Sequence, residues 1–181
     1  VAGFVMVYLS ATLPLSLSLP LTVLITVALG YLVERAAYKP LRDAPRMSIM
    51  ISAIGVSYLL QNLMWDVTGG LAKQYPTIPF ISDSVTIFTA TTKMVTVITP
   101  FLTLALVFLL VRLINGTKIG MAMRAVSKDF ETARLMGIKI DRVISVTFVI
   151  GSFLAAVGSI LYFSNYTAVT PTVGAMPGLN A

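Results

Sequence analysis

Residues 94–114 read MVTVITPFLTLALVFLLVRLI, an apolar stretch with no charged residue before Arg112. A helix needs about 20 residues to cross roughly 30 Å of hydrocarbon, and this stretch has that length. Three others are also apolar enough and long enough, and a shorter one at residues 1–9 is expected to be the end of a further helix. The three are residues 13–33, 47–65 and 143–163. The sequence therefore predicts an all-α, polytopic transmembrane helical bundle with about four full spans and a partial N-terminal one.

The composition fits a membrane protein and excludes several kinds of site. Hydrophobic residues make up 57% of the 181 and charged residues only 11%, whereas about a quarter of the residues in soluble domains are charged. The chain contains neither Cys nor His, so disulfides, thiolate or imidazole metal sites and Cys or His nucleophile pairs are excluded. We expect no metal site and no cofactor. The net charge of +6 is expected to mark cytoplasmic loops, with no nucleic acid as partner.

The basic residues predict the orientation in the membrane. All but two of the 13 Lys and Arg lie in or at the edge of the two links that join the first span to the second and the third to the fourth. By the positive-inside rule these links face the cytoplasm, which places residues 66–92 and the tail after residue 163 outside. The outer loop at residues 66–92 ends in a β-branched run and is expected to hold a short hairpin or a re-entrant piece.

The spans are expected to carry no charge in their middle. Glu34, Asp66, Arg112 and Arg142 all lie at predicted span ends. Pumps coupled to protons or sodium generally need a buried carboxylate or cation, and the spans are expected to offer neither. The chain also lacks a G-x-x-x-x-G-K-[ST] phosphate loop. Active transport would therefore need energy from another subunit.

Two spans carry patterns that have both a structural and a functional interpretation. Ser57 and Gln61 stand four apart and share one helical face with Asn62 beside them. This polar stripe is interpreted either as hydrogen bonding between helices, worth about 0.6–2 kcal/mol for each bond, or as the wall of a solute path. The second pattern is a strip of small side chains on the fourth span, and it predicts close helix packing. The strip consists of Gly151, Ala155 and Gly158.

The inner loop at residues 115–142 predicts a short amphipathic helix. Ser127 or Asp129 can cap its start, and Gly137 is typical of a left-handed stop. Val126, Phe130 and Ala133 are expected to form its apolar stripe. Such a helix either lies on lipid headgroups or docks into a groove of a soluble partner, and the pattern alone leaves both open.

Three segments together resemble one family of membrane proteins. Residues 34–42, ERAAYKPLR, look like the first cytoplasmic loop of the Liv-type permeases, the membrane subunits of bacterial ABC importers for branched-chain amino acids. Residues 52–62 resemble the next helix of that family. The long cytoplasmic loop is matched by residues 120–125, Asp129, Ala133, Gly137 with Ile138, and residues 141–142. In order and spacing these segments cover most of residues 34–177.

The resemblance implies a single transmembrane permease domain over residues 1–181, located in the bacterial inner membrane and without an ATPase site of its own. Its partners would be two ATP-binding subunits, which bind the ATP, a second permease subunit, identical or homologous, and a periplasmic substrate-binding protein. The implied coupling helix lies at residues 129–137, and Arg124 and Ala125 lead into it. The residues implied to contact the ATPase are Arg124, Ala125, Asp129, Phe130, Ala133, Gly137 and Ile138.

The chain departs from the family pattern at both ends. Members have a helix before the position of Val1 and a glycine-rich stretch with more helices after Ala181, and Asn180 stands where a basic residue is expected. The alternatives to an importer permease are a passive channel, a secondary carrier, an intramembrane enzyme and a purely structural membrane subunit. An enzyme would need a catalytic dyad or metal cluster at membrane depth, and the sequence offers none.

Overall fold

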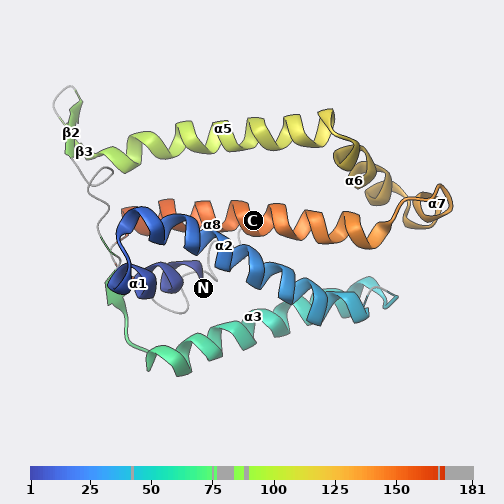
Figure 1. Ribbon diagram of the computed structural model, residues 1–181, viewed down its shortest axis with the longest axis horizontal. Helices are drawn as coiled ribbons and strands as arrows, with labels where there is room; N and C mark the ends of the chain where they lie inside the picture. Colours follow the sequence, from blue (N-terminus) through green and yellow to red (C-terminus); the bar gives the residue numbers. More distant parts are fainter. Residues whose placement is uncertain (42, 75, 77–83, 88–89, 167, 170–181) are drawn as a thin grey trace.

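The computed structural model describes residues 1–41, 43–74, 76, 84–87, 90–166 and 168–169, and in these ranges the chain is a bundle of long helices (Figure 1). In chain order the helices are α1 (Ala2–Thr12), α2 (Leu15–Val33), α3 (Arg46–Thr68), α5 (Met94–Gly116), α6 (Lys118–Lys128), α7 (Phe130–Leu135) and α8 (Ile140–Asn165). Helix α2 continues through a π-helical turn, η1 (Glu34–Tyr38), and a 3-10 turn, η2 (Lys39–Leu41). The predicted all-α transmembrane fold is confirmed.

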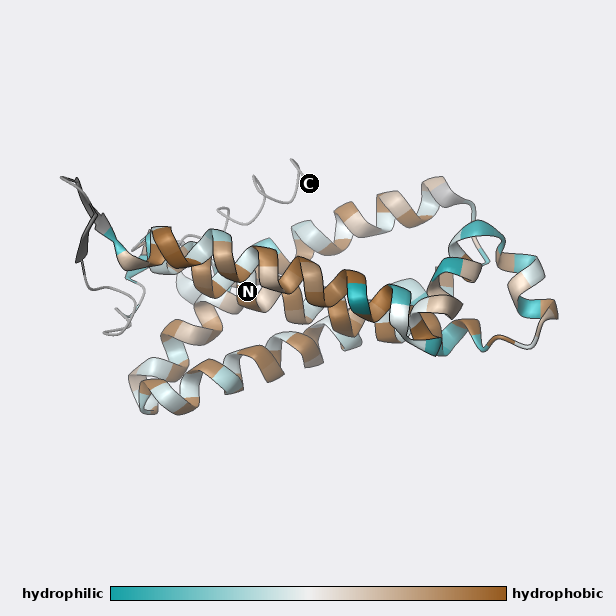
Figure 2. Ribbon diagram, turned by 90° about the horizontal axis from the view of Figure 1, so that it is seen from above, coloured by the Kyte–Doolittle hydropathy of each residue, from teal (hydrophilic) through white to brown (hydrophobic). Residues whose placement is uncertain are grey.

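Among the described residues, four helices are long and apolar enough to cross a membrane: Leu15–Leu41, Met47–Thr68, Met94–Gly116 and Ile140–Asn165. They correspond one to one with the predicted spans, and α1 corresponds to the predicted partial helix. Figure 2 shows the hydrophobic residues along the middle of the bundle and the hydrophilic ones gathered at its ends. Many apolar side chains point outward, as Phe101 and Ile51 do with 71% and 70% of their surface exposed. In a bilayer such side chains face lipid or neighbouring helices.

The packing within the chain centres on α2 and α8, with α1 laid against their outer halves (Figure 1). Phe4 and Met6 of α1 are buried with Phe163 of α8. Closer to the inner end, a methyl group added at Gly30 of α2 would collide with Ser152 Oγ of α8. The absence of a side chain at Gly30 therefore lets the two helices approach closely, as small residues do in membrane bundles.

The outer loop contains a hairpin, which confirms one of its two expected forms. Strands β2 (Ser84–Ile87) and β3 (Ala90–Lys93) are antiparallel, with Ser84 opposite Lys93. Two residues of the same loop, β1 (Lys73–Gln74), pair with β4 (Ala168–Val169) after α8. The loop after α3 and the segment after α8 therefore lie at one end of the bundle, as the alternation of spans requires.

The structure corrects the prediction that the spans hold no buried charge. The first span was predicted to end at Val33, but the helix runs on to Leu41, and the side chain of Glu34 is only 2% exposed. Ser145 Oγ of α8 donates a hydrogen bond to Glu34 Oε2 at 3.0 Å. The carboxylate is thus enclosed by protein at the inner end of the bundle, where a hydropathy pattern alone places a loop.

Labelling of introduced cysteines tests the orientation. Lys39 and Lys118 lie at one end of the bundle and Lys73 at the other (Figure 1). A Cys at either of the first two should be shielded from an impermeant thiol reagent in intact cells, because basic loops stay in the cytoplasm. A Cys at Lys73 should react, and this chain has no native Cys to add background. The reverse pattern would overturn the predicted orientation.

Candidate functional site

The inner ends of α5 and α8 are joined by a rigid corner followed by two short helices. Thr117 Oγ1 accepts a hydrogen bond from the backbone N–H of Gly120 at 3.0 Å and so caps the start of α6. Gly120 is buried, and any side chain there would collide with the carbonyl of Ile114. Arg124 Nη1 donates to Asn115 Oδ1 at 3.1 Å, which ties α6 back to α5. The end of a span therefore fixes the direction of α6.

Asp129 forms the joint between α6 and α7. Helix α6 ends at Lys128, and the carboxylate of Asp129 accepts hydrogen bonds from the N–H groups of Glu131 at 3.0 Å and Thr132 at 3.1 Å. These bonds make Asp129 the N-cap of α7, which settles the choice between Ser127 and Asp129. The Thr132 hydroxyl, which also donates to this carboxylate, is the main cause of a lowered pKa for Asp129, and the Thr132 N–H adds to it. The cap therefore stabilises the loop at neutral pH and is lost as the pH falls through this lowered pKa.

Gly137 ends α7 in the left-handed conformation that its type predicted. Its φ is +79°, its N–H donates to the carbonyl of Arg134 at 3.1 Å, and the N–H of Ile138 donates to the carbonyl of Ala133 at 3.2 Å. These two bonds form a Schellman motif, which satisfies carbonyls left open at the helix end. Because the motif turns the chain sharply, the direction of α7 is fixed relative to α8.

One residue of the predicted apolar stripe, Ala133, faces the inside of the loop. Ala133 is 3% exposed, so it packs inside the loop and leaves no room for a partner, and a glutamate there would disrupt the loop itself. Phe130 is 40% exposed, and Ala125 is half-buried on α6. The expectation treated the helix as continuous across Asp129, whereas the break at that residue changes which side chains of α7 face outward.

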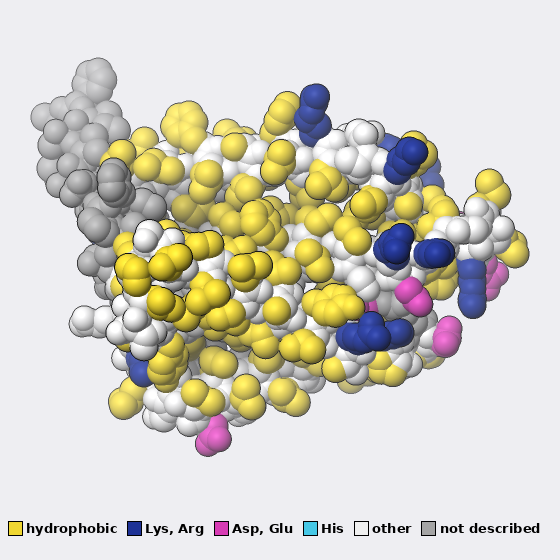
Figure 3. All heavy atoms as spheres, viewed as in Figure 1, with side chains coloured by type: hydrophobic (Ala, Val, Ile, Leu, Met, Phe, Trp, Pro, Cys, Tyr) yellow, Lys and Arg dark blue, Asp and Glu magenta, His cyan; other side chains and the backbone are white. Residues whose placement is uncertain are grey.

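Leu135 and Met136 are the residues that the sequence reasoning missed. They are 87% and 79% exposed, the highest values among the large hydrophobic side chains described. Both lie at the end of α7, at the tip of the inner loop, where Lys and Arg side chains also gather (Figure 3). Two neighbouring apolar side chains this exposed, beyond the ends of the spans, are typical of a protein contact. We call Leu135 and Met136 the apolar tip.

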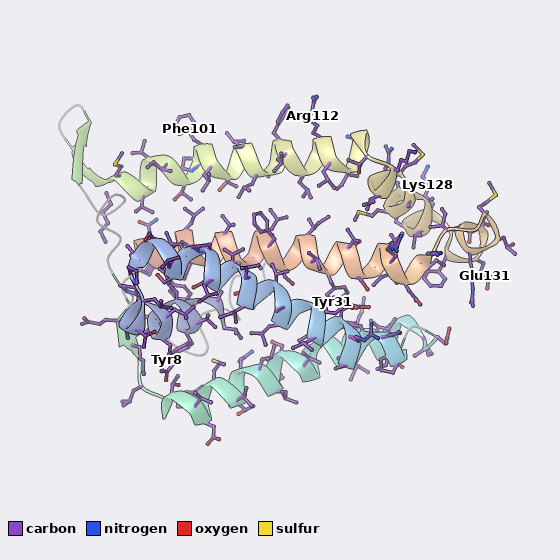
Figure 4. All side chains as sticks on the ribbon, in the orientation of Figure 1. Tyr8, Tyr31, Phe101, Arg112, Lys128 and Glu131 are labelled. Carbon is purple, nitrogen blue, oxygen red and sulfur yellow. The ribbon has the colours of Figure 1, made fainter. Side chains whose placement is uncertain are left out.

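A cavity of about 550 Å³ adjoins α7. Lys39 and Asp43 of the first inner loop line one side, and α7, the link after it and the start of α8 line the other. Figure 4 shows the same end of the molecule, with Lys128 and Glu131 pointing away from the spans. The two inner loops therefore form one continuous surface. The remaining lining residues are Phe130, Arg134, Ile138, Lys139, Ile140, Asp141 and Arg142.

The polar stripe of the second predicted span lies on α3. Gln61 Nε2 donates to Ser57 Oγ at 3.1 Å, and Asn62 Nδ2 donates to the carbonyl of Tyr58 at 2.8 Å. Ser57 and Asn62 are exposed and Gln61 is half-buried. The hydrogen bonds of the stripe described here thus stay within α3.

The small-residue strip lies on the open face of α8. Gly151, Ala155 and Gly158 are exposed, and no atom lies within 4 Å of a methyl group added at either glycine. The close approach between α2 and α8 uses the other face, where Ser152 meets Gly30 and Ala156 is fully buried. Helix packing at Gly151, Ala155 and Gly158 therefore stays a prediction about contacts outside this chain.

Comparison with known proteins assigns the chain to a family. A model of the family described as "Branched-chain amino acid transport system / permease component" matches residues 1–181. The chain is 36% identical over 163 residues to the high-affinity branched-chain amino acid transport system permease protein LivH of Escherichia coli. It is 35% identical over 162 residues to LivH of Salmonella typhimurium and 32% over 163 to BraD of Pseudomonas aeruginosa.

Each of these alignments covers 88% of this chain and 53% of the relative, so the chain spans about half the length of the curated relatives it matches. No solved structure matches it. The predicted resemblance is confirmed, because the matched family is the one that the residues of the inner loops indicated. The chain belongs to the family of permease components of branched-chain amino acid transport systems.

Proposed function

We propose that this chain forms part of the permease of an ABC importer that carries branched-chain amino acids, or related amino acids or amides, into the cytoplasm. The proposal rests on the inner loop of this chain, which belongs to the permease family. In that loop α7 is fixed at both ends and presents the apolar tip beyond the spans. A helix held in this way suits the transmission of force from a soluble partner. The groove that accepts it would belong to an ATP-binding subunit.

The assembly contains two ATP-binding subunits, which supply the energy, and a second permease subunit, homologous or identical. A periplasmic binding protein delivers the solute, and the complex sits in the bacterial inner membrane. The chain itself is not an enzyme and binds no cofactor. The open small-residue strip, Gly151, Ala155 and Gly158, packs against a helix outside this chain, because its face of α8 has no neighbour among the described residues.

A secondary carrier is the main alternative, and the burial of Glu34 removes one reason against it. The sequence suggested that no carboxylate is buried, yet Glu34 is buried. Family membership is what favours an ATP-driven importer, since the relatives are permease proteins of high-affinity transport systems. A carrier would work without ATP-binding subunits.

The test uses the full-length protein. Expressed with its neighbouring genes, it should co-purify with two ATP-binding subunits, and in proteoliposomes it should take up a branched-chain amino acid only with ATP inside and binding protein outside. Vesicles without ATP are the control. Uptake that is equally fast without ATP would reject the importer in favour of a channel or carrier.

Part of the solute path is proposed to run along Ser57, Gln61 and Asn62. Replacing Gln61 by Leu removes a donor and acceptor from the half-buried centre of this stripe, so uptake should fall at least about tenfold while the amount of assembled complex stays constant. Gln74→Leu, in the outer strand β1, is the matched control. If the Gln61→Leu complex fails to assemble, the stripe serves packing and the path lies elsewhere.

A further inference from the structure

Glu34 lies in the turn where α2 changes its helical form. The N–H of Lys39 donates to the carbonyl of Glu34, five residues back, so the turn is wider than an α-helical one. The side chain is 2% exposed, and its carboxylate accepts the hydrogen bond of the Ser145 hydroxyl at 3.0 Å. A buried charge is costly unless hydrogen bonds compensate it, so the donor at Ser145 stabilises the carboxylate in this position.

Among the described contacts, those on either side of this bond are close packing between α2 and α8 and not hydrogen bonds. Gly30, one turn before Glu34, faces Ser152, and the ring of Tyr38, one turn after it, lies 5.0 Å from that of Phe148. Apolar contacts of this kind tolerate sliding, whereas a hydrogen bond to a buried carboxylate has a defined direction and length. The bond between Glu34 and Ser145 thus sets the register of the two helices at their inner ends.

Ser145 also stands close to the loop formed by α6 and α7. Helix α8 begins at Ile140, three residues after Gly137, and Ser145 lies little more than one turn further on. A displacement of α7 must therefore reach α8 through a very short link. Lys39 of η2 and Arg134 of α7 line the same cavity, so the inner end of α2 is a neighbour of that link as well.

We propose that Glu34 is a positioning residue that acts through Ser145, so that α2 follows the start of α8 whenever the α6–α7 loop moves. The inference rests on the proposed function, because the movement comes from the ATP-binding subunits. Without the bond, those subunits would still bind and hydrolyse ATP. The spans would respond incompletely, so that less solute would cross for each ATP consumed.

The experiment measures uptake and ATP hydrolysis together, in proteoliposomes that contain the full-length permease, its partners and the binding protein. Ser145→Ala and Glu34→Leu should each lower the amount of solute transported per ATP about fivefold or more, a size typical of coupling between sites. Ser145→Thr, which keeps the hydroxyl, should transport as much solute per ATP as the unaltered protein. The matched control is Thr147→Ala, because the Thr147 hydroxyl bonds only to the carbonyl of Val143 in its own helix, at 2.8 Å, among the described contacts.

Combining Ser145→Ala with Glu34→Leu separates a shared bond from two independent defects. If the residues act through one bond, the double variant should transport as much solute per ATP as Glu34→Leu alone. An unchanged ratio in Ser145→Ala, equal to that of Thr147→Ala, would overturn the proposal and leave the importer function intact. So would a loss of assembled complex at an unchanged ratio, because it indicates packing. If the unaltered complex does not couple uptake to ATP, the proposed function fails and the positioning role fails with it.

Discussion

Replacing Leu135 and Met136 together by serine is expected to detach the ATP-binding subunits from the membrane complex. The two side chains of the apolar tip are 87% and 79% exposed. Burying one such side chain in a partner contributes about 1.5–3 kcal/mol, so the pair accounts for roughly 3–6 kcal/mol of binding. Since each 1.4 kcal/mol is about a factor of ten in affinity, loss of the pair should weaken binding at least about 100-fold.

Co-purification of the ATP-binding subunits with the tagged permease measures this loss. Leu71→Ser is the matched control, because Leu71 is 72% exposed but lies in the outer loop, at the opposite end of the bundle from the apolar tip. The control should keep the subunits bound. Full retention of both subunits by the double variant, at normal uptake, would show that the apolar tip is not the docking contact.

Gly137→Val is the second change with a large expected effect. A β-branched residue resists a φ of +79°, at a cost of about 1–3 kcal/mol, so the Schellman motif at the end of α7 should open. The apolar tip lies directly before this turn and should lose its fixed direction. We expect ATP hydrolysis to become independent of solute or the subunits to dissociate, while the permease still inserts in the membrane.

Gly69→Val provides a control with the same kind of strain. Gly69 ends α3 with a φ of +64°, at the outer end of the bundle, and a methyl group there would also meet open space. If strain alone mattered, both variants would lose activity together. The docking role of the loop predicts that only Gly137→Val loses coupling to ATP, and identical behaviour of the two variants would refute it.

The membrane fold could be predicted from the sequence because hydropathy and length depend on local composition. All four spans follow from apolar runs, and local chemistry predicted a stop at Gly137 and a cap at either Ser127 or Asp129. The inner end of α2 could not be predicted in this way. Glu34 ends an apolar run, and its hydrogen-bond partner Ser145 lies on a helix far along the chain, which hydropathy does not reveal.

The outward face of the inner loop could not be predicted from the sequence for a different reason. A stripe drawn through Val126, Phe130 and Ala133 assumes one helical register, and the N-cap at Asp129 interrupts that register. Ala133 turns inward as a result, and Leu135 is left outside. Helical periodicity predicts a face only while the helix is unbroken, so a cap inside a short amphipathic segment has to be located first.

The bond between Glu34 and Ser145 also constrains when the inner end of α2 can reach its final packing during synthesis. The two residues are 111 positions apart, and synthesis at about 5–20 residues per second separates their appearance by roughly 5–20 s. During that interval the carboxylate has no α8 to enclose it, and hydrocarbon is a poor place for a charge. Until α8 is made, the inner end of α2 is therefore expected to stay at the membrane surface, where water reaches the carboxylate. The inner end of α2 is thus expected to reach its final packing only after α8 has been inserted.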